Sequence, residues 1–299
     1  VEYYELNADL GLVLPANFYS ALQHYLRHGL REGRRYSYSQ CYIESPWMRR
    51  ATSGPVAKSE SKPCAEKVAC LVHVYYPEIW PDLCTYIRNL DGVDCDVYVN
   101  IVDSIWAEDL HQQIRHDVPN ANIGIAENCG REIGGHMASL TGVNIDDYVA
   151  FFLVHTKKSR HFSEKYSGNW RNSLLYPLMG DPEKVAKNIS LMSSDQRIGI
   201  IGAAAWRQHD VADNDEHYTY LLRKLGISPE SEVGEYVSGT MMMVRPEILQ
   251  RVYDLLRDEV FENADGKDVE WLRDGQLEHA VERVLVAICR SLDLRVHWC

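Results

Sequence analysis

The sequence predicts an α/β fold in which a mostly parallel, Rossmann-type sheet is flanked by helices, with a small helical appendage at its N-terminal end. From residue 67 onward, strand-like and helix-like patterns alternate, which is typical of a parallel sheet with right-handed crossovers. The run 148–154 is continuously apolar, as expected for a strand buried on both faces. Polar residues follow several strands directly, and open α/β sheets bind ligands beyond the carboxyl ends of their strands.

The composition is that of a soluble globular protein, with 45% hydrophobic and 25% charged residues among 299. This length suits one large α/β domain with an appendage, or two small domains. The net charge of -12 argues against a nucleic-acid binder, because phosphate backbones are bound by an excess of Lys and Arg. No apolar run reaches the length of a membrane span. The eight Cys are scattered without CxxC pairs, which favours reduced thiols in a cytoplasmic protein over disulfides or zinc ligands.

Residues 1–66 are expected to form the appendage. In the stretch 17–34 the apolar residues fall on one stripe of an expected helix. This helix either docks a partner or, as we prefer, caps the main domain. The stretch 46–63 is rich in Ser, Lys, Ala and Pro and reads as a linker. Because the sequence begins at Val1 and ends at Cys299 without a tail, we expect it to be a piece of a longer chain.

The main domain is expected over residues 67–299, and its first half alternates regularly. We expect strands at 68–75, 97–102 and 123–126, and helices at 77–90 and 107–117. Asp103 follows the second of these strands, where it either contacts a ligand or caps the next segment.

A glycine-rich turn and a buried strand stand out in the middle of the chain. In the turn 128–132, Gly130 is free to adopt a positive φ, and a helix should start near Ile133. Gly134 and Gly135 allow a backbone or a ligand to approach the first helical turn, whose free N–H groups favour an anion. The apolar strand then ends in His155, Thr156, Lys157, Lys158 and Ser159, which form either a ligand site or a solvated junction.

The second half continues the alternation less regularly. Trp170 and Arg171 stand in a polar run, where they bind a ligand or, more commonly for a Trp, anchor a loop. Residues 206–235 are irregular enough to be an insertion or a lid. We expect helices at 182–192 and 246–256, and strands at 197–204 and 236–244, the last of which carries Gly239, Thr240 and a Met run that suits the core.

The last helix is expected over 274–291, with one strongly apolar face. His279, Glu282 and Arg283 share the other side through their i, i+3 and i+4 spacing. From the pattern alone this side is a solvated charged face.

Several separated blocks together resemble a known family. They are residues 72–76 with Trp80 and Pro81, 128–134, 155–159, 170–171, 239–241 and 279–283. In this order, over about residues 68–297, they resemble the rhamnan synthesis F family of bacterial polysaccharide glycosyltransferases, which is similar to the GT-A nucleotide-sugar fold. One departure is Glu132, because the family usually has Asp after the Arg of the turn.

The resemblance implies an activity and its partners. The expected reaction moves a sugar from a nucleotide-sugar donor, of the dTDP-rhamnose or UDP-galactofuranose type, to a lipid-linked glycan acceptor. The product is a growing bacterial cell-surface polysaccharide such as O-antigen, the outer part of lipopolysaccharide. Other transferase domains of the same chain or complex are expected partners, and the location is cytoplasmic or peripheral at the inner face of the plasma membrane. The alternative is a catalytically silent glycan-binding or scaffolding domain.

The resemblance also assigns roles to residues. The donor would be contacted by Asp103, Asn128, Arg131, Glu132, His155, Lys157 and Lys158, and the acceptor by Trp170, Arg171, Gly239 and Thr240. The catalytic group would come from the last helix: Glu282 is preferred as base or organiser, with His279 beside it, Asp274 as runner-up and Glu132 third.

The resemblance bears on metal as well. Many GT-A enzymes hold a divalent ion through an acidic motif at the end of the strand that here ends in His155-Thr156-Lys157. Since a charged Lys cannot bind Mg²⁺ but can neutralise a diphosphate, we expect transfer without a metal cofactor, with Mg²⁺ or Mn²⁺ as the alternative.

Overall fold

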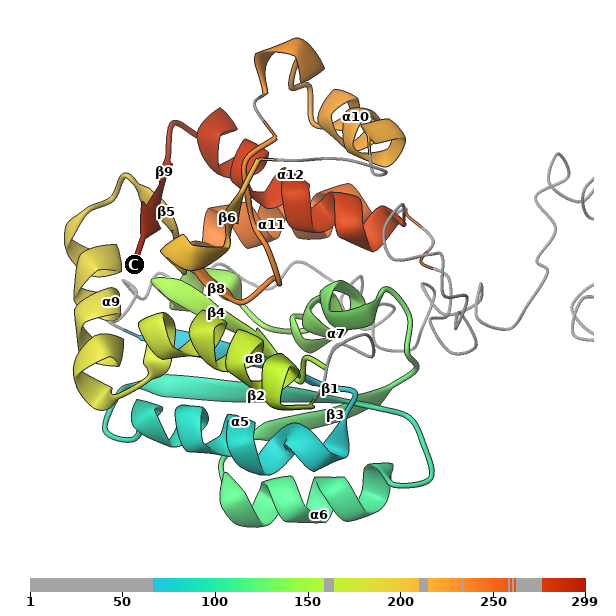
Figure 1. Cartoon of the computed structure of the whole chain (residues 1–299), viewed down its shortest axis with the longest axis vertical. Coiled ribbons are helices and arrows are strands. Elements are labelled where there is room, and N and C mark those ends of the chain that lie inside the picture. Colours follow the sequence, from blue (N-terminus) through green and yellow to red (C-terminus); the bar gives the residue numbers. More distant parts are fainter. Residues whose placement is uncertain are drawn as a thin grey trace, which may run out of the picture.

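The computed structural model describes residues 67–158, 164–209, 215–232, 234–257, 259, 261 and 276–299 (Figure 1). The appendage and linker expected over residues 1–66, and the candidate Asp274, lie outside these described residues.

A seven-stranded sheet forms the centre of the molecule, in the order β3-β2-β1-β4-β8-β5-β9. Within it only β8 runs antiparallel to its neighbours, so the expected mostly parallel sheet is confirmed. A separate pair, β6 and β7, is antiparallel. The strands are β1 (Val68–Val74), β2 (Cys95–Val102), β3 (Asn122–Ala126), β4 (Ala150–His155), β5 (Ile198–Gly202), β6 (Arg207–Gln208), β7 (Tyr236–Val237), β8 (Met242–Val244) and β9 (Arg295–Trp298).

Helices cover both faces of this sheet (Figure 1). One face packs against α5 (Trp80–Ile87), α6 (Ala107–Asp117), α8 (Glu164–Met179) and α9 (Pro182–Ser194). The other packs against α7 (Arg131–Ser139), α11 (Pro246–Leu256) and α12 (Leu277–Ser291), and α10 (Asp215–Lys224) lies on α12.

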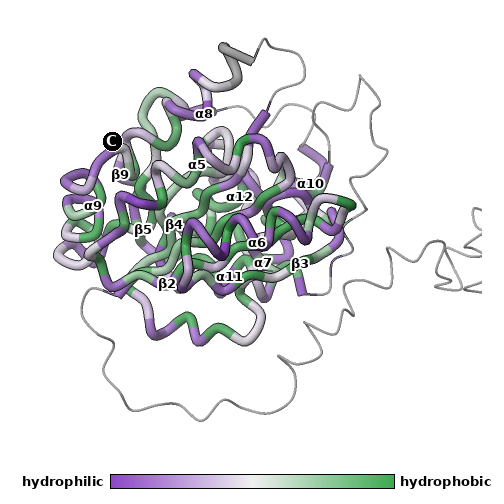
Figure 2. Tube along the Cα trace, turned by 90° about the horizontal axis from the view of Figure 1, so that it is seen from below, coloured by the Kyte–Doolittle hydropathy of each residue, from purple (hydrophilic) through white to green (hydrophobic). Residues whose placement is uncertain are grey.

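The alternation of side chains along the strands explains these two cores, because successive residues point to opposite faces. The Met run at the start of β8 shows this alternation: Met241 and Met243 belong to one core and Met242 to the other, which confirms its assignment to the interior. Hydrophobic segments accordingly gather at the sheet and on the helix faces turned toward it (Figure 2).

Four parts of the fold differ from the sequence expectation. The single strand expected over 236–244 is broken into β7 and β8, because Gly239 and Thr240 adopt positive φ values of 101° and 54°. The polar run around Trp170 is part of α8, and the irregular stretch 206–235 contains α10. Strand β9 was not expected; it pairs in parallel with β5 at the sheet edge.

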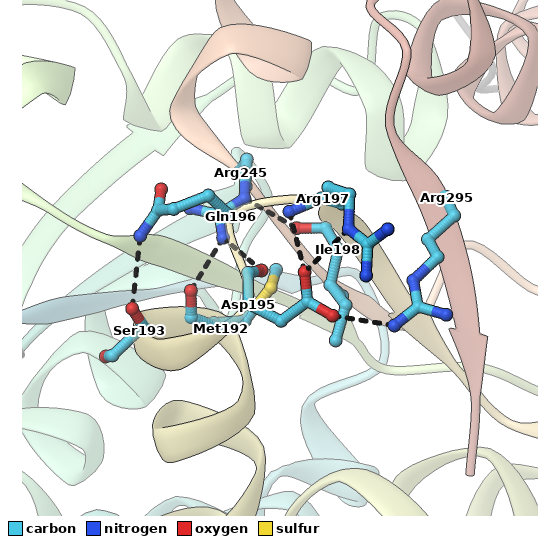
Figure 3. A network of polar contacts seen from close by, with 8 residues as sticks. All are labelled: Met192, Ser193, Asp195, Gln196, Arg197, Ile198, Arg245 and Arg295. Carbon is cyan, nitrogen blue, oxygen red and sulfur yellow. Dashed lines mark hydrogen bonds and ion pairs between the residues drawn. The ribbon is translucent and has the colours of Figure 1, made fainter.

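A buried arginine fastens the amino end of β5 (Figure 3). Arg245, the residue before α11, donates to the carbonyl groups of Met192, Asp195 and Ile198 at 2.6, 2.9 and 2.5 Å. Asp195 also binds Arg295 of β9 at 2.6 Å. This network joins α9, β5, α11 and β9, and it lies at the opposite end of β5 from the carboxyl ends of the parallel strands.

Candidate active site

The sheet topology brings three chain segments to one place. His73 in β1 and His155 at the end of β4 are register partners. Since β8 runs antiparallel to β4, the residues just before β8 lie at the same edge as the residues just after β4. The contact is direct: the Nε2 of His155 is 2.9 Å from the carbonyl oxygen of Gly239.

The turn before α7 explains the glycines of this segment. Gly130 has a φ of 69°, as its position predicted. A Cβ on Gly134 would lie 1.8 Å from the carbonyl oxygen of Cys129, and one on Gly135 would lie 2.0 Å from Nδ1 of His73. The expected close approach to the first helical turn is therefore confirmed, and what approaches is the protein's own turn and the end of β1.

Two carboxylates from different helices meet at one hydroxyl. Glu282 of α12 accepts hydrogen bonds at Oε1 from the backbone N–H of Gly239 at 2.5 Å and from Oγ1 of Thr240 at 3.0 Å. Glu132, in the first turn of α7, lies with its Oε1 3.2 Å from the same Thr240 oxygen. α7 and α12 thus deliver one acid each to the segment before β8.

The two acids have different proton affinities. Burial raises the pKa of Glu282, and the nearby Glu132 adds to this, although Lys157 opposes it. Burial would also raise the pKa of Glu132, but His155, in its protonated form, and Lys157, which is charged at neutral pH, lower it below its ordinary value. At neutral pH Glu132 is therefore the firmly ionised member, and Glu282 is the one whose protonation changes more readily.

Three buried histidines, His73, His136 and His155, interact electrostatically with Glu132 and are called the histidine layer below. His73 bonds to the side-chain oxygen of Asn100 at 2.9 Å, and burial lowers its pKa. Burial also lowers the pKa of His155 to about 4 and that of His136 well below its ordinary value. The layer is therefore neutral at pH 7, which leaves Lys157 as the cation that acts on both acids.

The two lysines after β4 point to different neighbours. Lys157 places its Nζ 4.4 Å from the ring centre of Trp170. Lys158 instead pairs with Glu78 at 3.0 Å. Thr156, which precedes the two lysines, is buried and accepts hydrogen bonds from the backbone N–H groups of Tyr75 and Tyr76 at 2.9 and 3.0 Å. These bonds attach the start of the loop after β4 to the segment after β1.

The two residues predicted for the acceptor lie differently on α8. Trp170 is partly buried and packs against Trp206 with ring centres 5.3 Å apart. Arg171 is only 7% exposed; it donates to Asp82 at 2.7 Å and to the carbonyl oxygen of Lys157 at 3.1 Å. Its guanidinium holds the loop after β4 against α5, so contact with an acceptor stays a prediction for this residue.

The family model of rhamnan synthesis protein F matches residues 48–293. The chain belongs to this family. Membership indicates a role in the synthesis of rhamnan-type polysaccharide. No curated protein matches the sequence. Among the described helices, none combines the length and apolarity needed to cross a membrane.

The remaining donor candidates of this rhamnan synthesis family member lie along the same edge. Asp103 is exposed after β2, and it does not cap α6, because that helix has Trp106 at its N-cap without a side-chain cap bond. Asn128 is buried in the turn before α7. Arg131 has a φ of 51° and reaches across to the start of α12, where it meets Gln276 at 2.9 Å.

Helix α12 is buried nearly all round, which corrects the expected solvated face. Arg283 is buried, with its guanidinium 4.5 Å from the ring centre of Tyr236, and donates to the carbonyl oxygen of His279 at 2.8 Å. It also lies 3.3 Å from Oε2 of Glu282, whose side chain is 13% exposed. His279 itself is partly buried one turn before Glu282.

Sequence reasoning missed His73, His136 and Asn100. The sequence indicated them only weakly. His73 and Asn100 lie near the ends of expected strands, and His136 lies in the helix expected to start near Ile133. Within the described ranges, no group of three or more His, Cys, Asp or Glu side chains is arranged to hold a metal ion.

Proposed function

We propose that the protein is a glycosyltransferase that moves a sugar from a nucleotide-sugar donor to a growing bacterial cell-surface polysaccharide. The observation that carries this proposal is the pairing of Glu132 and Glu282 around Thr240, next to the cation Lys157, at the carboxyl ends of the strands. Such an edge is where open α/β sheets bind nucleotides and other ligands. Family membership supports the same polysaccharide context.

Transfer requires a group that neutralises the leaving diphosphate. We assign this role to Lys157, because Lys158 is engaged by Glu78 whereas Lys157 is directed toward Trp170 and acts on both carboxylates. An ammonium group supplies the compensating charge directly. We therefore propose transfer without a divalent ion; activity that is abolished by EDTA and restored by Mn²⁺ or Mg²⁺ would contradict this.

An inverting reaction also requires a base for the acceptor hydroxyl. Glu282 suits this role better than Glu132, since burial raises its pKa toward the working pH, where a base is most effective. Glu132 stays ionised close to the turn before α7 and is better suited to orienting the donor. Asp274 stays a candidate outside the described residues.

The proposal is tested first by nucleotide binding and then by turnover. A ligand that binds only the folded protein stabilises it by about 2.7 kcal/mol at a hundredfold excess over Kd. UDP, dTDP and GDP at millimolar concentration are expected to give at least one clear rise in melting temperature. If none of them does, the donor site is refuted. A panel of nucleotide sugars with a lipid-linked glycan then identifies the donor through release of the nucleotide.

A non-catalytic glycan-binding domain is the second candidate. The Trp170–Trp206 pair favours it, because aromatic faces stack on sugar rings. Such a domain would bind glycan without any release of nucleoside diphosphate from the donor panel.

A further inference from the structure

Thr240 occupies an unusual backbone conformation in the middle of the candidate site. It is fully buried and has a φ of 54°, although a β-branched residue is a genuine outlier in the left-handed region. Gly239 precedes it at a φ of 101°. Both peptide groups of Gly239 are engaged, since its N–H donates to Glu282 and its carbonyl oxygen faces Nε2 of His155. Strained conformations of this kind persist only where the surroundings impose them, and they cluster at functional sites.

The strained backbone sets the position of one hydroxyl. Oγ1 of Thr240 lies 3.0 Å from Oε1 of Glu282 and 3.2 Å from Oε1 of Glu132. A hydroxyl carries one proton, so it can donate to only one of the two carboxylates at a time. The lone pairs of the hydroxyl oxygen can accept a hydrogen bond from the other carboxyl group when that group is protonated. The rotation of this hydroxyl is thereby coupled to which acid carries a proton.

We propose that Thr240 is a positioning residue that orients the carboxylate of Glu282 and sets its proton affinity by placing one hydroxyl proton between Glu282 and Glu132. The inference rests on the proposed function in so far as Glu282 acts as the base. The two acids that this hydroxyl meets differ in proton affinity: burial raises the pKa of Glu282, whereas charge interactions hold that of Glu132 below its ordinary value.

Three variants at this position separate the hydroxyl from the backbone strain. Thr240→Val keeps the shape and the β-branch but removes the hydroxyl. Thr240→Gly removes the hydroxyl and relieves the strain, so it is expected to fold even if the valine variant does not. Thr240→Ser restores the hydroxyl. The readout is the titration of the Glu282 side-chain carboxyl carbon by ¹³C NMR, assigned by its absence in Glu282→Gln.

Both variants without the hydroxyl are expected to raise the pKa of Glu282 by about one unit or more, since a hydrogen bond to a charged group is being lost. The serine variant is expected to titrate like the wild type. A wild-type titration in the glycine variant, or equal shifts in all three variants, would overturn the proposal. The titration needs no substrate, so it stands even if the donor panel gives no activity.

In an active enzyme, the valine and glycine variants should lose roughly tenfold or more in kcat and shift the acidic limb of the kcat profile to higher pH. UDP affinity should stay unchanged, and serine should rescue the profile. Loss of UDP binding in the glycine variant would instead indicate a donor-binding role and would overturn the assignment.

Discussion

The buried His155 should make the protein sensitive to mild acid. Burial lowers its pKa from 6.5 to about 4 in the folded protein, while the unfolded chain keeps the ordinary value. Between pH 6.5 and about 4, His155 is therefore protonated in the unfolded state but mostly neutral in the folded state. The contribution to stability is complete above pH 6.5 and is lost progressively as the pH falls toward 4. At pH 4.5 the loss from this residue is about 2–3 kcal/mol.

The assay is urea denaturation at pH 7.5 and 4.5, followed by circular dichroism. His155→Gln is the informative variant, because an amide N–H of Gln can still donate to the Gly239 carbonyl oxygen but does not titrate. On acidification the wild type should lose about 2–3 kcal/mol more than this variant. His116, exposed on α6, supplies the control: His116→Gln should follow the wild type.

The comparison is differential for a physical reason. Burial also lowers the pKa values of His73 and His136, so the whole histidine layer weakens the fold in acid. Those contributions are present in both the wild type and the His155→Gln variant, so the difference reports the imidazole of His155 together with its charge coupling to His73, His136 and Glu132. Parallel loss of stability in the two proteins would show that His155 is not held neutral by its surroundings, and would refute the reasoning.

Three further predictions follow from named contacts. Lys157→Gln should lower turnover at least tenfold more than Lys158→Gln, because only the first removes the charge assigned to the leaving diphosphate; similar losses would contradict that assignment. Glu282→Gln should lose roughly 10²- to 10⁴-fold in turnover while UDP still binds, and near wild-type turnover would exclude it as the base. Gly135→Ala should destabilise the protein by about 1–3 kcal/mol, since the new Cβ would lie 2.0 Å from an imidazole nitrogen. Gly168→Ala is its control in another helix: among the described residues no atom lies within 4 Å of an added Cβ, so the melting temperature should rise slightly, and equal effects would refute the packing argument.

The sequence alone determined the fold class and one side of the site. The apolar run before His155 and the alternation of strands and helices are local patterns, and local patterns are what periodicity reports. Because parallel strands end at the same edge, the polar residues after β4 and the turn before α7 could be expected at one place. In the structure the residues after β4 and the turn before α7 do lie at this edge of the sheet. Gly130 has the positive φ that its position predicted. The domain boundary at residue 66 and the roles of the site residues remain predictions.

Only the tertiary structure decided how the other side of the site is built. The break between β7 and β8 depends on contacts from Gly239 and Thr240 to Glu282, some forty positions along the chain, and no local pattern carries them. Helical spacing likewise separated the apolar stripe of α12 from its charged side, but it could not reveal that β7 and the segment before β8 cover that side. Burial by those distant segments is what raises the pKa of Glu282. Proton affinity depends on the full three-dimensional surroundings of a carboxyl group, so it could not be read from the order of residues along one helix.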